Sequence, residues 1–374
     1  MMLVAVAAVI LTASGCGRPR SLFEPTPRVQ REVLKYGTEE AVARAQERAD
    51  SERTVQAYGD LAQTYALTKQ PKLARQTLEK AVSLDPTYPR TAVLLARILL
   101  SEGKGVEAEK LARGILTKYP NQPEASETLA RCLMGQGKQE QAQQVLTTAL
   151  QSHGNRAELH WAQADLFAIQ GRFDDSLKQY QQALKLSPQN TSLRLSYIRP
   201  LMAKGDKEQA VAEALKAVEQ QPSSADVRFM AGATLQQAGR DSEALAQYKE
   251  TLVLDPGMFA AANNLALLLA DRQQDTSAAV TWARRAVQGA PRSLACADTF
   301  GWALARDGQY QQGLSVLRVV HKAWPDNPAV WYHLGWTLVK AGQKDEGLKL
   351  LRQTAESGRD DAAKQAQKAL EELS

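Results

Sequence analysis

The sequence predicts an all-α protein built from a row of stacked helical hairpins. Two residue types return along most of the chain at an interval of 34 residues, and both are residues that end helices. The prolines are Pro86, Pro120, Pro188, Pro222, Pro256, Pro291 and Pro325, and the glycines are Gly103, Gly137, Gly171, Gly205, Gly239, Gly308 and Gly342. A unit this short cannot bury its apolar face alone, so neighbouring units must stack.

The first half of each unit carries the apolar pattern of a helix. Its fourth, seventh, eighth and eleventh places are mostly apolar, as at Leu95, Ala96 and Leu99 in the second unit. Steps of three and four residues lie on one side of a helix with about 3.6 residues per turn. This stripe is therefore the expected core-facing side of a first helix.

The second half of each unit predicts another helix that packs closely on the first. Small residues recur there, at Ala74, Ala108, Ala142, Ser176, Ala210, Ala244 and Ala279. The glycine suits a left-handed residue just after the first helix, and the proline ends the second. One interval, from Pro256 to Pro291, is a residue longer, so an extra residue is expected between helices at 272–277.

These units resemble the tetratricopeptide repeat. The first unit shows the match at Tyr58, Leu61, Ala62, Tyr65, Ala74, Leu78, Ala81 and Pro86. The resemblance implies a right-handed superhelical solenoid of nine units over residues 55–358. Residues 37–54 are expected to form an N-terminal helix. Residues 359–374 are expected to form a capping helix with Ala366, Ala369 and Leu370 on its inner face.

The first residues predict export and lipid attachment. Residues 1–15 are apolar and then small, and Cys16 follows, a pattern that resembles a bacterial lipoprotein signal peptide. The resemblance implies lipidation of Cys16, and Gly17 after it implies an outer-membrane location facing the periplasm. No Lys or Arg precedes Cys16, unlike the usual signal. A cleaved secretory signal or an apolar terminus with an incidental cysteine stays open as the alternative.

Residues 16–36 are expected to form the lipid anchor and a flexible linker. Pro19, Pro25 and Pro27 accompany five basic residues and only two acidic ones. This composition favours an extended tether over packed structure.

Composition and motifs argue against an enzyme. The chain has 46 basic and 41 acidic residues in 374, a balance that does not favour nucleic-acid binding. It contains no nucleophile elbow, phosphate-binding glycine loop, dinucleotide fingerprint or metal-binding His and Cys spacing. No cofactor or metal is expected. Cys132 and Cys296 are expected to be small buried side chains.

A second side of the first helices, at the second, fifth, ninth and twelfth places, is expected to face a concave groove. The candidate partner-binding residues there are Arg90, Arg97, Arg131, Trp161, Arg199, Phe229, Asn263, Trp302, Tyr332 and Trp336. The arginines suggest an acidic or carboxylate-bearing protein segment, and the exposed aromatic residues also permit a saccharide. The alternatives are a solvated charged face and aromatic residues that pack on the next helix.

The expected function is a non-enzymatic, membrane-anchored scaffold that binds protein partners and helps to assemble a cell-envelope machine. The string from Asp298 to Trp302 and that from Trp331 to Gly335 also resemble tetratricopeptide lipoproteins of exopolysaccharide export. A lipoprotein that assembles a pilus or a secretion system, and a saccharide-binding protein, remain alternatives.

Overall fold

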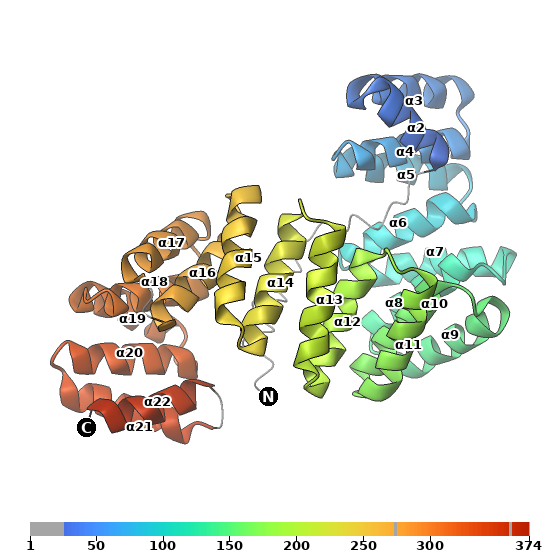
Figure 1. Ribbon diagram of the computed structural model, residues 1–374. Coiled ribbons are helices and arrows are strands. Elements are labelled where there is room, and N and C mark those ends of the chain that lie inside the picture. The colour runs from blue at the N-terminus through green and yellow to red at the C-terminus, as the bar shows by residue number, and fades with distance from the viewer. Residues whose placement is uncertain (1–25, 273–274, 359–360, 374) are drawn as a thin grey trace. The chain divides into compact units, whose positions relative to one another are not determined.

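The computed structural model describes residues 26–272, 275–358 and 361–373, and within them the protein is entirely helical (Figure 1). The described part contains 21 helices and no strand. It divides into two compact units, one ending at Ala210 and the other beginning at Val211, so the boundary falls within the helix α13 (Lys207–Gln220). The predicted all-α architecture is confirmed.

Consecutive helices pair as hairpins. In the first unit the helices are α2 (Pro27–Tyr36), α3 (Thr38–Glu52), α4 (Val55–Leu67), α5 (Pro71–Leu84), α6 (Pro89–Ser101), α7 (Gly105–Lys118), α8 (Pro123–Gly135), α9 (Gln139–His153), α10 (Ala157–Ile169), α11 (Phe173–Leu186) and α12 (Thr191–Lys204). After α13 (Lys207–Gln220), the second unit contains α14 (Ala225–Ala238), α15 (Asp241–Leu254), α16 (Phe259–Arg272), α17 (Thr276–Gly289), α18 (Leu294–Arg306), α19 (Tyr310–Ala323), α20 (Pro328–Lys340), α21 (Lys344–Glu356) and α22 (Asp361–Leu373).

First helices also pack on the first helices of neighbouring hairpins. This holds for α4, α6, α8 and α10 in the first unit and for α16, α18 and α20 in the second. The predicted core stripe is buried, since Leu95, Ala96 and Leu99 are at most 5% exposed. Within each unit, these first helices form a layer on which a partner site would be built.

The recurring glycines and prolines have the predicted roles. All seven glycines of the period have φ between +73° and +88°, the left-handed region that follows a first helix. Each proline of the period stands two residues after the end of a second helix, as Pro86 does after α5. The longer interval lies between α16 and α17, as predicted, although residues 273–274 are outside the described residues.

The first hairpin lacks this glycine and has Lys69 at the equivalent place, with φ at +60°. A side chain in this region costs about 1–2 kcal/mol. Replacing Lys69 with glycine is therefore expected to stabilise the α4–α5 hairpin by about 1 kcal/mol, measured by hydrogen exchange of its amides. Gly103→Ala is the matched control, because an added Cβ there would meet no atom within 4 Å and only the backbone strain changes. It should lose a similar amount. Equal exchange in Lys69→Gly and the unchanged chain would contradict the expectation.

The small residues predicted in second helices all lie at close helix contacts. Ala74, Ala108, Ala142, Ser176, Ala210, Ala244 and Ala279 are 0% exposed. Gly313 and Gly347 take the same place in the last two hairpins. A Cβ at Gly347 would lie 2.7 Å from the carbonyl oxygen of Gly335 on α20 and 2.8 Å from the backbone nitrogen of Val339. The α20–α21 backbones therefore approach more closely than any side chain permits.

The predicted flexible linker is wrong for residues 27–36, which form α2. Thr26 caps this helix, and Pro27 occupies its first turn, where a missing N–H costs nothing. Val29 is 1% exposed, and the backbone N–H of Thr26 donates to the Gln63 side chain on α4 at 3.0 Å. The composition of this segment predicted a tether, but one buried valine and a good cap suffice to hold a short helix on α3 and α4. Residues 16–25, with Cys16, and the predicted signal peptide lie outside the described residues.

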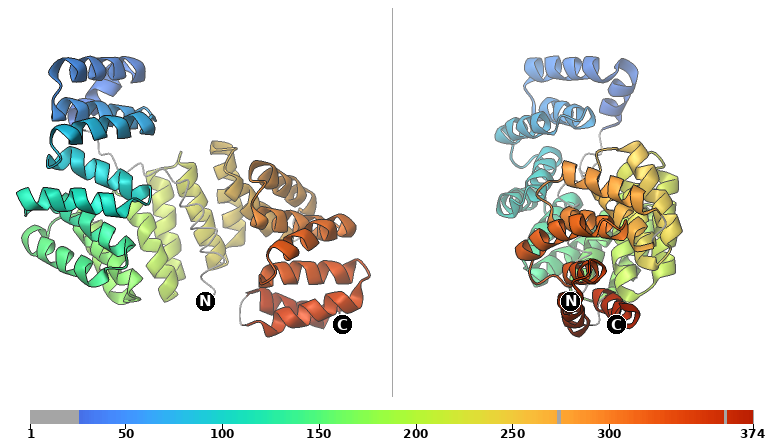
Figure 2. Two further views of the ribbon diagram at one scale, coloured as in Figure 1. Left: turned by 180° about the vertical axis from the view of Figure 1, so that it is seen from behind. Right: turned by 90° about the vertical axis from the view of Figure 1, so that its left-hand side faces the viewer.

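The helices predicted at both ends of the repeats are present. Residues 38–52 form α3, and Asp361–Leu373 form α22, whose Ala366 and Ala369 are buried. Figure 2 shows α20, α21 and α22 side by side, and each contacts the other two. Among the described helices, none combines the length and the apolar character needed to cross a bilayer.

Candidate functional site

The candidate site is the first-helix face, defined as the second, fifth, ninth and twelfth places of the first helices. It has one part in each compact unit, and each part has its own chemistry. In the first unit the face is dominated by charges, and in the second by aromatic rings.

Four charged side chains of α6, α8 and α10 form an ion-pair ladder in the first unit. Glu127 accepts hydrogen bonds from Arg97 Nη2 at 2.8 Å and from Arg131 Nε. Arg131 Nη1 also donates to Asp165 Oδ2 at 2.8 Å, and the hydroxyl of Tyr180 on α11 donates to the other oxygen of Asp165. The ladder thus links three successive hairpins.

The ladder is mutually neutralised. Burial alone would favour protonated Glu127, but the charges and hydrogen bonds of Arg131 and Arg97 prevail and lower the pKa of Glu127. The pKa of Arg131 is correspondingly raised by Glu127 and Asp165, against the effect of burial. The predicted basic groove is therefore wrong for Arg97 and Arg131. Their positive charges are held by carboxylates of the same protein and are not free to attract an acidic segment.

The other candidates in this unit differ in their surroundings. Arg90 is exposed and donates to Gln63 at 3.3 Å. Arg199 is exposed and makes no hydrogen bond or ion pair within the described part of the chain. Trp161 is half-buried, and the Arg131 guanidinium lies over it, 5.1 Å from the centroid of the Trp161 ring. The buried Nε1 of Trp161 has no hydrogen-bond acceptor in the described residues. Trp161 and Arg199 thus retain capacity for a partner.

In the second unit, α18 and α20 bring their rings together as the Trp302 cluster, which comprises Trp302, Tyr332, His333 and Trp336. Trp302 stacks on His333 at 4.5 Å between ring centroids and meets Trp336 edge-on at 5.2 Å. Tyr332 lies 5.4 Å from Trp302. The indole N–H of Trp302 donates to Asp271 Oδ1 at 2.8 Å.

Burial of these rings corrects the prediction that they face solvent. Trp302 is 1% exposed, Tyr332 8% and Trp336 9%, and Phe229 is 5% exposed beside Tyr248. Because α16, α18 and α20 pack directly on one another, their fifth and ninth places fill the layer between first helices. The faces of these four rings are therefore not available to a saccharide, and among the predicted aromatic residues only Trp161, in the first unit, is half-buried.

Two side-chain oxygens on this face, one from an amide and one from a carboxyl group, lack hydrogen-bond donors. Asn263 Oδ1 on α16 and Asp298 Oδ1 on α18 are buried and have no partner within the described residues. The two residues are 6% and 8% exposed and occupy the fifth place of consecutive first helices that pack together. Native structures seldom leave such acceptors unsatisfied, and each exception asks for an explanation.

The second oxygen of Asp298 holds a buried histidine. His333 Nδ1 lies 2.9 Å from Asp298 Oδ2. Burial disfavours the imidazolium, but the charge and hydrogen bond of Asp298 outweigh it and raise the pKa of His333. Burial raises the pKa of Asp271 nearby. Arg306 lies over Trp302 and Trp336, at 5.1 and 4.9 Å from their centroids.

Three acidic residues of this face were not among the predicted partner-binding residues. Glu127, Asp165 and Asp298 lie at its fifth and ninth places, but only arginine, asparagine and aromatic side chains were predicted to bind a partner. A signal was available, because Arg131 and Asp165 are one repeat apart at the same place with opposite charges. Within the described residues, no group of His, Cys, Asp and Glu side chains is arranged to hold a metal ion.

Comparison with known proteins agrees with this repeat architecture. One family model described as tetratricopeptide repeat matches residues 65–125, 99–166, 167–231 and 304–372. A second model with the same description matches residues 229–293. Together they cover well over half of the chain. No protein of curated function matches the sequence.

Several solved structures are similar in fold. The APC/C hetero-tetramer of Cut9 and Hcn1 has 12% identity and a TM-score of 0.57, with 99% of this chain and 83% of that chain covered. A thermophilic TPR protein of Thermus thermophilus has 23% identity and a TM-score of 0.46, with 49% and 100% covered. PilF of Pseudomonas aeruginosa has 19% identity and a TM-score of 0.48, with 55% and 93% covered.

Proposed function

Because the chain belongs to the tetratricopeptide-repeat family, we propose that it is a non-enzymatic scaffold that binds a protein or peptide on its first-helix face. The observation that carries this proposal is the pair of unpartnered acceptors, Asn263 Oδ1 and Asp298 Oδ1. A buried acceptor without a donor costs about 1–3 kcal/mol, which a bound donor restores. The expected partner segment therefore presents N–H groups or a basic side chain to α16 and α18, and its donors reach the two covered oxygens when neighbouring side chains move aside.

The Trp302 cluster supports this proposal as a rigid base for the site. Its rings and the Arg306 guanidinium hold α18 on α20, and the Trp302–Asp271 hydrogen bond holds α16 on α18. The backbones that carry Asn263 and Asp298 are thus held in place before a partner arrives. A preorganised site loses less entropy on binding than a mobile one.

Photo-crosslinking in the source cells tests the site. A photoreactive residue at half-buried Leu267, on the same helix face as Asn263, is expected to capture a defined partner. The same residue at exposed Lys249 on α15 is the control position. Asn263→Leu removes one acceptor and should weaken capture from position 267 about tenfold. Gln312→Leu, at an exposed position of α19, should leave capture unchanged. Equal capture from both positions, or no effect of Asn263→Leu, would exclude this face.

We also propose that the scaffold is anchored by a lipid on Cys16 at the bacterial outer membrane, facing the periplasm. The support is the signal-like pattern of residues 1–16. Multiple acyl chains give stable anchoring where a single chain does not. The wild-type chain is then expected in the membrane fraction and in the detergent phase of a phase partition, and Cys16→Ala in the soluble phase. A membrane fraction unchanged by Cys16→Ala would contradict lipid anchoring.

The machine that the scaffold serves is proposed to be one of the cell envelope, with exopolysaccharide export favoured by the strings at 298–302 and 331–335. Identification of the protein crosslinked from position 267 separates the candidates. An export component supports this assignment, and a pilus or secretion component supports the alternative.

A further inference from the structure

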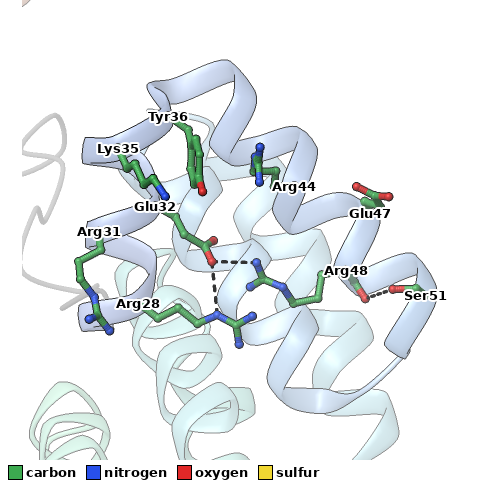
Figure 3. Close-up of a pocket in the computed structure, with 9 residues that line it drawn as sticks. All are labelled: Arg28, Arg31, Glu32, Lys35, Tyr36, Arg44, Glu47, Arg48 and Ser51. Atoms are coloured by element: carbon green, nitrogen blue, oxygen red, sulfur yellow. Dashed lines mark hydrogen bonds and ion pairs between the residues drawn. The ribbon is translucent and has the colours of Figure 1, made fainter.

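A cavity of about 580 Å³ lies between α2 and α3, within the range of about 300–1,000 Å³ typical of small-ligand sites (Figure 3). Five basic side chains line it: Arg28, Arg31, Lys35, Arg44 and Arg48. Only two carboxylates do so, Glu32 and Glu47. The lining of this cavity differs chemically from the first-helix face, because basic side chains outnumber acidic ones in it.

The carboxylates balance only part of this positive charge, even with two acids beside the cavity, Glu40 and Asp60, which pair with Arg44 at 2.8 Å and with Arg28 at 3.9 Å. A single oxygen of Glu32 accepts from Arg48 Nη2 at 2.8 Å and from Arg28 Nε at 3.4 Å. Figure 3 shows Glu47 apart from this pair, and Glu47 forms no ion pair with any described residue. Arg48 Nη1 is buried and has no acceptor among the described residues. The cavity thus contains a charged donor that an anion would satisfy.

Tyr36 holds two further cations, Arg44 and Lys35, at the cavity. The Arg44 guanidinium lies 3.9 Å from the centroid of its ring, and Lys35 Nζ lies 4.8 Å from it. Arg44 also pairs with Glu40 at 2.8 Å, whereas Lys35 has no carboxylate partner in the described part of the chain. A hydrogen bond from Lys35 lowers the pKa of the Tyr36 hydroxyl.

We propose that this cavity binds a terminal phosphate group, one attached to the rest of its molecule through a single oxygen. Arginine forks match phosphate oxygens in paired hydrogen bonds, and a terminal phosphate carries enough charge and acceptor oxygens to engage Arg48, Arg28 and Lys35 together. The same group occurs in free polyphosphates and in the headgroup of phosphatidic acid. If Cys16 is acylated as proposed above, the eleven residue-to-residue steps from Cys16 to Pro27 keep the cavity within about 40 Å of the bilayer, which brings headgroups within reach.

Calorimetry of the full chain with inorganic pyrophosphate tests the site. Arg31→Gln combined with Lys35→Gln is expected to weaken binding about tenfold, and neither residue makes an ion pair among the described residues, so folding should be kept. Lys72→Gln combined with Lys80→Gln removes the same charge from two exposed positions of α5 and should leave binding unchanged. Arg48→Lys retains the charge near Glu32 but loses the arginine fork, and should weaken binding as well.

Co-sedimentation with vesicles distinguishes the two sources, with Cys16→Ala in every chain so that no acyl chain contributes. Preference for phosphatidic acid over phosphatidylglycerol, abolished by Arg31→Gln with Lys35→Gln, identifies a headgroup site. Pyrophosphate binding without that preference identifies a free phosphate. Absence of both, or equal losses in the Lys72→Gln and Lys80→Gln control, would overturn the proposal whether or not the first-helix face binds a partner.

Discussion

Glu127→Gln is expected to destabilise α8 and its neighbours by about 3 kcal/mol, because it breaks a buried ion pair. Glu127 is 4% exposed and is the carboxylate that holds both Arg97 and Arg131. Glutamine fills the same space but leaves two arginines facing each other with one fewer negative charge. Hydrogen exchange over residues 123–135 measures the loss in local stability.

The matched control is Glu124→Gln on the same helix. Glu124 pairs with Arg156, but the two side chains are 32% and 40% exposed, and exposed pairs contribute about 0–1 kcal/mol. The effect at Glu127 should also depend on pH. Its pKa is lowered from the usual 4.5, so its stabilisation is complete above that value and is lost as the pH falls through the lower pKa of the folded state. Similar losses in both variants, or a Glu127→Gln deficit that persists in acid, would refute the ladder.

Gly347→Ala is expected to destabilise the α20–α21 hairpin by about 2 kcal/mol, and Gly347→Leu by more. Alanine is normally the better helix residue, by about 0.5–1 kcal/mol, so the sign of the change is diagnostic. The new methyl group would lie within 3 Å of two backbone atoms of α20, which cannot move aside as a flexible side chain can. Exchange of the α21 amides and the melting temperature report the change.

Gly114→Ala separates this close contact from the ordinary effect of helix propensity. Gly114 is also inside a second helix, α7, but a Cβ there would meet nothing within 4 Å. Gly114→Ala should therefore stabilise the chain by about 0.5–1 kcal/mol. If Gly347→Ala were equally stabilising, the α20–α21 contact would be looser than described.

The helices were predictable because their signals are local and repeated. Gly103 and its equivalents mark the left-handed residue after each first helix, and Pro86 and its equivalents mark where each second helix has ended. The close contact at Ala108 and its equivalents follows from side-chain size alone. Such features need only the residues of one hairpin, so a single sequence contains them.

The candidate site was less predictable because it depends on contacts between hairpins. Helical periodicity placed Trp302 and Trp336 together on one face, but it could not show that the next first helix covers that face. It likewise placed Arg97 on a groove without its partner Glu127, which is 30 residues away. At the N-terminus, Arg28, Arg31 and Lys35 have helical spacing, but proline content favoured a tether.

Both cysteine thiols of the described residues are buried and therefore poorly reactive. Cys132 is fully buried, and burial raises its pKa to about 12, while Cys296 is 6% exposed with its pKa also raised by burial. Oxidants and disulfide-exchange enzymes act on accessible thiolates, so neither residue offers them a target. Repeats of this kind can therefore be used in an oxidising environment without mispaired bridges, and a reporter cysteine added at the surface would be labelled without competition from these two.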